Sequence, residues 1–212
     1  MIISRMGTER IAHNAFEQAR KREGVPADSK RRVTCVDKSN VVPALAFFRK
    51  VFEEVGQEYP DVEKELVYAD AMTVYMFQQP EHYDIVVTEN MLGDILSDLG
   101  SATVGGLGMA PSAEVGECHS LFQPIPGSAP DIADKGIANP IAAILSDAMM
   151  FQWLGERHED AEISAIGDKI QRATEAVLSE GRFGTSNLGG RSTTGEVGDA
   201  MAEKATLISE PF

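Results

Sequence analysis

Apolar residues in the N-terminal part of the chain recur with two alternating spacings. Between Thr8 and Gly24 they fall three or four positions apart, which is the spacing of one face of a helix. The continuous run 33–36 predicts a short buried strand, and Pro43 then opens a second stretch of helical spacing that ends at Gly56. A helix, a strand and a second helix are therefore predicted here.

The order of strand and helix returns further along the chain. Residues 65–68 predict a strand before a helix over 71–77, and residues 84–88 predict a strand before a helix that begins near Met91. Strands that alternate with helices in this way are typical of a sheet covered by helices. We therefore expect an α/β fold.

Glycine and proline interrupt both patterns over residues 105–111. So dense a group of breakers indicates a place where one domain passes into the next, and we expect the boundary near residue 104. The chain is then divided into one domain over 1–104 and another over 105–212.

Helices are predicted beyond this boundary as well. A loop rich in proline and glycine over 123–131 leads to Asn139 and Pro140, which suit the N-cap and the first position of a helix. This helix is expected to run to about residue 153, and a longer one is expected over about 160–180.

Charge and cysteine content narrow the classes of function. The 212 residues include 33 acidic and 19 basic ones, and the net charge of -14 opposes binding to nucleic acid or to an anionic membrane surface. Cys35 and Cys118 cannot build a disulfide framework, and the first residues lack the apolar core of a secretory signal. The apolar stretch 141–154 is interrupted by polar residues and falls short of the roughly 20 residues that span a bilayer. We expect a cytoplasmic protein whose ligands are small molecules or metals.

Two aspartates offer a candidate metal-binding pair. Asp94 and Asp98 stand four positions apart on a predicted helix, so their carboxylates leave the same face about one turn apart. Like charges at this spacing repel unless a cation lies between them, and Mg²⁺ is usually held by carboxylate, water and substrate oxygens. The alternative is an ordinary solvated helix face. In either case we expect Ile95, Leu96 and Leu99 to face the core.

Lys38 and Asp70 each follow a predicted strand. Because α/β proteins gather their ligand-binding groups at the carboxyl ends of strands, Lys38 is a candidate base and Asp70 a candidate third carboxylate. Each also has a simpler interpretation. Lys38 is otherwise a surface lysine paired with Asp37, and Asp70 is otherwise a helix N-cap.

The segment Gly127, Ser128, Ala129, Pro130 and Asp131 is a candidate nucleotide loop. Its small residues let the backbone approach a ligand, and Asp131 is able to accept hydrogen bonds from a ribose. The segment lacks the spacing Gly-x-Gly-x-x-Gly, and most loops of this composition only connect elements. The four histidines have no zinc-binding spacing, which argues against a zinc site.

Several ordered segments together resemble the isocitrate/3-isopropylmalate dehydrogenase family of β-decarboxylating dehydrogenases. They are residues 36–41 (VDKSNV), 68–72 (YADAM), 88–98 (TENMLGDILSD), 127–131 (GSAPD) and 136–140 (GIANP). The resemblance covers nearly the whole chain. It implies the three-layer α/β fold of that family without the N-terminal part of its large domain. Residues 1–104 would be the small, dimerising domain, and residues 105–212 would be the C-terminal half of the large nucleotide-binding domain.

The resemblance also implies an activity, the NAD-dependent oxidation and decarboxylation of a 2-hydroxy-3-carboxy acid. The aspartate before Lys38 and residues 137–140 favour 3-isopropylmalate, an acid of leucine biosynthesis, although members acting on isocitrate, homoisocitrate, tartrate or D-malate share most motifs. Mg²⁺ or Mn²⁺ would lie on Asp94 and Asp98, with Asp70 contributed across a homodimer. Lys38, acting in the partner's site, would be a base or proton relay for the substrate hydroxyl.

Positions for NAD⁺ follow from the same resemblance. Asn40 would lie beside the nicotinamide, Asp131 would bind the hydroxyls of the adenosine ribose, and Asn139 would lie near the adenine. The loop residues Gly127, Ser128 and Ala129 complete this cofactor-binding set.

Two features depart from the pattern of the family. Gln123 and Pro126 stand where its members usually have a glutamate and a histidine in the nucleotide loop. Members of the family are also considerably longer, and neither the arginines that clamp the substrate nor the tyrosine that reprotonates the enolate has a matching motif here. The second hypothesis is therefore a non-catalytic dimerising or regulatory module that pairs with a longer paralogue.

Overall fold

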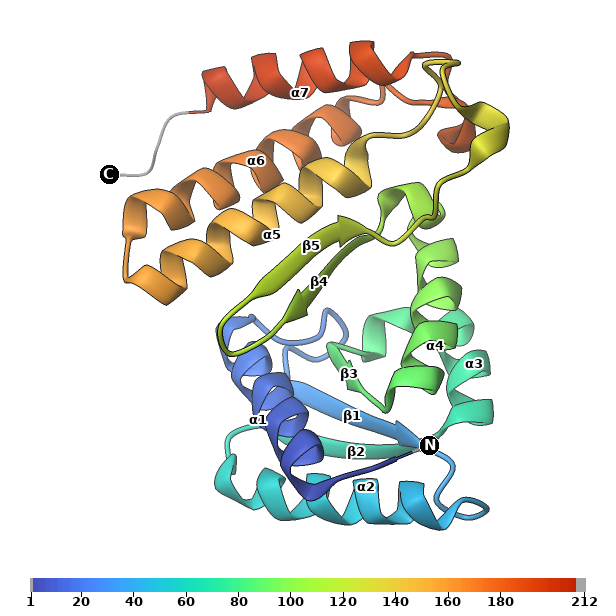
Figure 1. Ribbon diagram of the computed structural model, residues 1–212, viewed down its shortest axis with the longest axis vertical. Helices are drawn as coiled ribbons and strands as arrows, with labels where there is room; N and C mark the ends of the chain where they lie inside the picture. The colour runs from blue at the N-terminus through green and yellow to red at the C-terminus, as the bar shows by residue number, and fades with distance from the viewer. Residues whose placement is uncertain (1, 209–212) are drawn as a thin grey trace. The chain divides into compact units, whose positions relative to one another are not determined.

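The computed structural model describes residues 2–208. The chain divides into two compact units, Met1–Gly100 and Ser101–Phe212. Helix α4 (Asn90–Thr103) spans this division (Figure 1). The division falls between residues 100 and 101, whereas the sequence places a boundary between residues 104 and 105.

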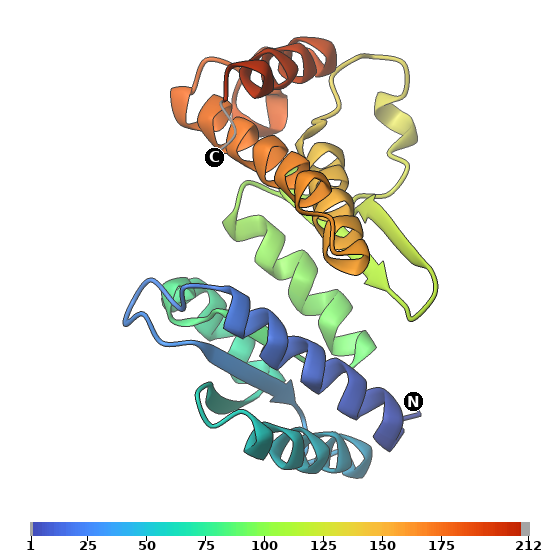
Figure 2. The same cartoon turned by 90° about the vertical axis from the view of Figure 1, so that its left-hand side faces the viewer.

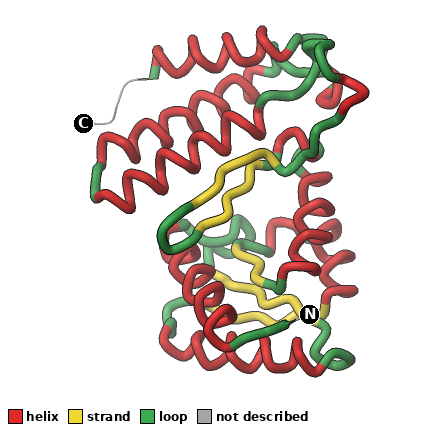
Figure 3. The backbone as a smooth tube through the Cα atoms, viewed as in Figure 1, coloured by secondary structure: helices red, strands yellow, loops and turns green. Residues whose placement is uncertain are grey.

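The first unit is built on a parallel sheet. Strand β1 (Arg32–Asp37) lies between β2 (Glu63–Tyr68) and β3 (Ile85–Val87) (Figure 3). All six residues of β1 are buried, as expected of a central strand that is covered on both faces. In the register of β1 and β2, Asp37 pairs with Tyr68, so these two strands end at the same edge of the sheet.

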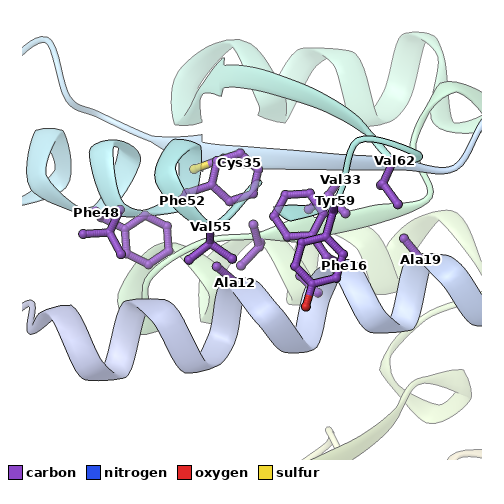
Figure 4. Close-up of a cluster of buried hydrophobic side chains, with 13 residues drawn as sticks. Ala12, Phe16, Ala19, Val33, Cys35, Phe48, Phe52, Val55, Tyr59 and Val62 are labelled. Carbon is purple, nitrogen blue, oxygen red and sulfur yellow. The ribbon is translucent and has the colours of Figure 1, made fainter. Parts of the chain in front are cut away.

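Helices cover both faces of this sheet and give it three layers. Helices α1 (Arg5–Lys21) and α2 (Pro43–Val55) pack on one face of this sheet (Figure 2). This face carries Val33 and Cys35, which lie among side chains of both helices (Figure 4). Helices α3 (Ala69–Gln78) and α4 pack on the opposite face, against Val36 and Val67. The α/β fold in three layers that the sequence implies is therefore confirmed.

The core under α1 and α2 is largely aromatic. The ring of Phe16 stacks on the rings of Phe52 and Tyr59, with centroid distances of 5.2 and 4.8 Å (Figure 4). Both phenylalanines are fully buried. Cys35 lies in the same cluster, where burial raises the pKa of its thiol, so it is a packing residue and not a nucleophile.

The second unit combines a hairpin with packed helices. Strands β4 (Pro111–Val115) and β5 (Ser120–Pro124) pair antiparallel. The helices are α5 (Ile141–His158), α6 (Ala161–Glu180) and α7 (Thr194–Leu207). Helices α5 and α6 approach closely at Gly155, where an added Cβ would lie 2.1 Å from the hydroxyl of Ser164. Short 3₁₀ helices lie in both units at Gly56–Glu58, Pro80–His82, Leu107–Met109, Pro130–Ile132 and Ser186–Leu188.

The expected elements are confirmed, with differences at their ends. The loop expected over 123–131 is partly wrong, because Gln123 and Pro124 belong to β5. The N-cap of α5 is Pro140 and not Asn139, although the Asn139 side chain still accepts a hydrogen bond of 3.0 Å from the Ile141 N–H. Within residues 2–208, no helix has both the length and the hydropathy that crossing a bilayer needs.

Candidate active site

Lys38 and Asp70 form an ion pair at the shared edge of β1 and β2. The Lys38 Nζ atom lies 2.5 Å from Asp70 Oδ1, because each residue follows closely on one of two strands that end in register. Hydrogen bonding from Lys38 is the main cause that lowers the pKa of Asp70 below its ordinary value. The simpler interpretation of Lys38 as a partner of Asp37 is wrong, since Asp37 is paired with Arg49.

Asp70 is not the N-cap of α3. The N-cap is Tyr68, and Asp70 lies in the first helical turn, where a carboxylate interacts favourably with the helix dipole. Its side chain is 69% exposed and Lys38 is 31% exposed, so both groups remain accessible to a ligand or to another chain.

Asp94 and Asp98 lie on α4 as the spacing predicts, and both are exposed. Glu89, which has no role in the sequence-based prediction of the site, has a buried carboxylate. This carboxylate accepts hydrogen bonds from the N–H groups of Met91 and Leu92 at 3.0 and 2.8 Å. Glu89 therefore caps the helix that carries the two aspartates. An acidic residue just before a helical run was the available signal.

A complete metal site is not assembled by the described part of one subunit. Within residues 2–208, no group of three or more His, Cys, Asp or Glu side chains is placed to hold a metal ion. Asp70 therefore does not join Asp94 and Asp98 within one chain. Further ligands for a metal on α4 would have to come from substrate, water or another chain.

The apolar residues of α4 differ in their exposure. Leu96 is buried and Leu99 packs against the same cluster, as expected. The expectation for Ile95 is wrong, because this side chain is 55% exposed. The apolar stripe of α4 is therefore wider than the surface that this chain covers, and Ile95 lies on the uncovered part.

The loop residues of the second unit line a cavity of about 730 Å³. Gly127, Ser128 and Ala129 lie on its wall together with Asn139, which comes from the start of the α5 region. Ala129 has a left-handed backbone with φ of 40°, and a Cβ added to Gly127 would meet no other atom within 4 Å. The backbone at this wall is therefore open to a ligand.

Asp131 and Asn40 lie elsewhere. Asp131 is exposed on the 3₁₀ helix Pro130–Ile132 and is not among the residues that line the cavity, although both Ala129 and Ile132 are. The acidic residue that does line it is Asp134. Asn40 is exposed in the turn after β1, in the first unit.

Sequence reasoning missed part of the cavity wall. Gly105, Gly106 and Gly108 line it, although the sequence indicated only a domain boundary there. Ser186 and Asn187 line it as well, although they lie far from Gly127 in the sequence. A run of glycines was the only local signal, and it did not distinguish a ligand-binding wall from a linker.

The two residues that depart from the family pattern have different positions. Pro126 lines the cavity, whereas Gln123 is exposed on β5 and does not. The segment just before α5 is bound to the start of α7. The backbone N–H and the hydroxyl of Thr194 donate hydrogen bonds to the backbone carbonyls of Gly136 and Ala138, at 2.8 and 2.5 Å.

Comparisons with known proteins agree on one family. Residues 1–201 match the family model described as isocitrate/isopropylmalate dehydrogenase. The chain is 45% identical over 204 residues to the 3-isopropylmalate/3-methylmalate dehydrogenase of Methanocaldococcus jannaschii, an alignment that covers 96% of this chain and 58% of the relative. It is 43% identical over 201 residues to the homoisocitrate dehydrogenase of the same organism, covering 94% of this chain and 54% of the relative.

A solved structure gives the same result. The crystal structure of isocitrate dehydrogenase from Methylococcus capsulatus aligns with a TM-score of 0.84 at 38% identity, covering 96% of this chain and 57% of that one. The chain thus spans somewhat more than half the length of the relatives that it matches.

Proposed function

Because this chain belongs to the isocitrate/isopropylmalate dehydrogenase family, we propose that it takes part in the NAD-dependent oxidative decarboxylation of a 2-hydroxy-3-carboxy acid. The proposed substrate is 3-isopropylmalate, and homoisocitrate is the nearest alternative, since relatives of both names match the chain at similar identity. Cytoplasmic location stays a prediction from the cysteine content.

The residues that line the cavity of the second unit fit NAD⁺. The cavity of about 730 Å³ lies in the size range of small-molecule sites. Its wall combines glycines and apolar side chains with a few polar residues, among them Ser128 and Asn139, which suits a nucleotide with a planar base and a polar ribose. Gly127, Ser128 and Ala129 would approach the adenosine, with Asn139 beside the adenine. Asp131, next to this wall, would accept hydrogen bonds from the ribose hydroxyls.

The acidic residues of the first unit fit Mg²⁺ or Mn²⁺. Asp94 and Asp98 present hard oxygen ligands from one helix face, and Asp70 of a second subunit would add a third. When bound, the metal ion supplies Lewis acidity to the substrate oxygens and NAD⁺ supplies the hydride acceptor.

Lys38 is the residue that we assign to proton transfer. Its Nζ atom would accept the proton of the substrate hydroxyl as a base or relay, in the site of the partner subunit. Asp70 lies 2.5 Å from it, so one subunit presents the two groups together. Asn40, two residues after Lys38, would lie beside the nicotinamide and the substrate.

One observation carries this proposal. Residues 127–129, Asn139 and the glycines of 105–108 are far apart in sequence, yet all of them line one cavity, as a nucleotide site of this family would require.

A chimera tests the proposal directly. The N-terminal part of the M. jannaschii 3-isopropylmalate/3-methylmalate dehydrogenase that this chain does not match is joined to residues 1–212. NADH formation is then followed with 3-isopropylmalate or homoisocitrate, NAD⁺ and Mn²⁺. We expect turnover, and we expect Lys38→Ala to lower kcat by roughly 100-fold or more.

The control is Lys50→Ala, which removes an exposed lysine of α2 and should leave kcat unchanged. A folded chimera that binds NAD⁺ but oxidises neither acid would contradict the proposal, and so would full activity of the Lys38→Ala variant.

A second candidate function, a non-catalytic dimerising module, is favoured by Pro126. This residue lines the cavity at the place where the family usually has an imidazole. Calorimetry with NAD⁺ separates the two functions. A catalytic chain should bind NAD⁺ weakly and gain affinity on Gln123→Glu and Pro126→His, whereas a chain that shows no binding even with both substitutions would be the module.

A further inference from the structure

We propose that Asp37, Arg49 and Tyr68 form a positioning unit that holds the ammonium group of Lys38 beside Asp70. The inference rests on the proposed function, because it concerns the residue that acts there as the base. None of the three residues of the unit is expected to touch the substrate, so all three are positioning residues.

Asp37 fixes the backbone on both sides of Lys38. Its side chain is fully buried at the end of β1. One carboxylate oxygen accepts a hydrogen bond of 2.7 Å from the Ser39 N–H, the residue after Lys38. Lys38 therefore lies between Asp37, which is buried at the end of β1, and Ser39, whose backbone N–H is bound to the Asp37 side chain.

Arg49 makes this arrangement rigid from the neighbouring helix. From α2, its Nε and Nη2 atoms donate to the two Asp37 oxygens at 2.6 and 2.9 Å, which is the two-pronged geometry that only arginine provides. A buried carboxylate is stable only when it is paired and hydrogen-bonded, so removing Arg49 would leave Asp37 without its charged partner and force its side chain to move. This movement would release Ser39 and the turn that carries Lys38.

Tyr68 links this pair to the lysine side chain. It lies opposite Asp37 in the register of β1 and β2. Its ring contacts two cations, with Arg49 Cζ 5.0 Å and Lys38 Nζ 5.7 Å from the ring centroid. Both distances are within the range of attraction between a cation and an aromatic ring. Lys38 is therefore held by a carboxylate at its tip and by a ring alongside its ammonium group.

The contacts of Asp37, Arg49 and Tyr68 restrict the orientation of the Lys38 side chain. Lysine has a flexible stem of four carbons, and a partly exposed lysine at a strand end ordinarily samples many rotamers. Here the three residues come from two strands and a helix, and their contacts converge on the backbone flanking Lys38 and on its side chain. A base that acts in a second subunit needs its nitrogen directed at the substrate. This arrangement fixes the place of the Lys38 Nζ atom, which accepts a proton from the substrate only after it has released one of its own.

The test uses NMR of the full chain with ¹³C-labelled lysine, so it needs no turnover. Lys38→Met assigns the Cε–Hε resonance of Lys38. The ring current of Tyr68 should shift this resonance upfield of the other lysines. Tyr68→Phe should keep the upfield shift, and Tyr68→Leu should abolish it. Arg49→Gln should reduce it and broaden the line, and Arg49→Lys should fail to restore it.

Arg20→Gln is the matched control. Arg20 makes the same kind of fork with Asp61, at 2.9 and 2.6 Å, and contacts the Tyr59 ring at 4.5 Å. These partners differ from Asp70 and Tyr68, the partners of Lys38. Its loss should leave the Lys38 resonance unchanged. Melting temperatures distinguish an effect on the stability of the protein from an effect on the orientation of Lys38. If Arg49 has a merely structural role, its variants should have a lower Tm but an unchanged Lys38 resonance.

A Lys38 resonance that is the same in wild type, Tyr68→Leu and Arg49→Lys would overturn the proposal. If Arg49→Gln fails to fold, the Tyr68 pair of variants still decides the outcome. Full activity of the Lys38→Ala chimera would instead refute the proposed function and leave the NMR result on positioning intact.

Discussion

The Lys38 ammonium group and the Asp70 carboxylate lie 2.5 Å apart within one subunit, at the ends of neighbouring parallel strands. Asp94 and Asp98 lie on α4, and in the part of the chain that the structure describes they do not share a cluster with Asp70. If these residues serve one site, Lys38 and Asp70 would come from one subunit and the two aspartates of α4 from the other.

We predict that the chain forms a homodimer through α3 and α4. Phe77 of α3 is 58% exposed, and Met91 and Ile95 of α4 are each 55% exposed, so apolar surface on these helices remains to be covered. Light scattering at high micromolar concentration should give a dimer, and Ile95→Asp should give a monomer. Leu121→Asp, at a residue of β5 that is 51% exposed, is the control and should remain dimeric. A monomeric wild type would contradict the prediction.

We predict that Asp94 and Asp98 bind Mg²⁺ or Mn²⁺ weakly in the absence of substrate. The affinity is low because substrate oxygens and water normally complete the coordination of such ions. In a Mn²⁺ titration, Asp94→Asn/Asp98→Asn should weaken binding roughly tenfold or more, since two hard anionic ligands are lost. Asp199→Asn/Glu203→Gln removes an exposed acidic pair of the same spacing from α7 and should have no effect. Equal affinity of the wild type and the Asp94/Asp98 variant would show that these two residues do not bind the metal ion.

We predict that NAD⁺ binds more tightly than NADP⁺ and that Asp131 is the cause. A carboxylate accepts hydrogen bonds from the ribose hydroxyls and repels a 2′-phosphate, and each hydrogen bond lost costs about 1 kcal/mol. Calorimetry should show that Asp131→Asn removes the preference. Asp134→Asn is the informative comparison, because Asp134 lines the cavity and Asp131 does not. If only Asp134→Asn changes the preference, the assignment passes from Asp131 to Asp134.

We predict no significant dehydrogenase turnover for a polypeptide of these 212 residues alone. Arginine clamps that position the substrate contribute a large part of catalysis, and two of the arginines near the start of this chain are engaged in other contacts. Arg5 is paired with Glu54, and Arg32 is buried among carboxylates. NADH should stay at background with 3-isopropylmalate, isocitrate, D-malate or tartrate in the presence of NAD⁺ and Mn²⁺. Turnover on any of these acids would mean that the catalytic groups lie elsewhere than inferred.

We predict that Arg32→Met destabilises the protein in a pH-dependent way. The Arg32 side chain is 3% exposed and donates to Asp28, to Glu63 and to the His82 carbonyl. Its loss should lower the free energy of unfolding by about 2 kcal/mol at pH 7, measured by urea denaturation.

The pH dependence has a definite sign. Hydrogen bonding from Arg32 is the first cause that lowers the pKa of Asp28 and of Glu63 in the folded state. Carboxyl groups with a lowered folded pKa stabilise the protein above their ordinary pKa, which is about 4, and lose this effect as the pH falls. The difference between wild type and Arg32→Met should therefore narrow below about pH 4. A difference that stays constant down to pH 3 would contradict this account.

Most of the helices and strands, and the kinds of residue in the candidate site, can be predicted from the sequence alone. The apolar spacing between Pro43 and Gly56 predicts a helix, and the structure has one over Pro43–Val55. The run 33–36 predicts a strand that the structure extends to Arg32–Asp37. These predictions succeed because helical and extended backbones impose their own period on which side chains are buried.

The partners of these residues depend on the tertiary fold. Lys38 is paired with Asp70 and not with the adjacent Asp37, because strand register brings together residues 32 positions apart. The hairpin of β4 and β5 has prolines at paired strand ends, which read as loop residues in the sequence. The cavity wall joins Gly105, Gly127 and Asn187, and Ile95 is exposed on a stripe that the sequence assigns to the core. Local periodicity records whether a position favours burial, but which surface covers it depends on contacts between distant segments, and no local pattern encodes those.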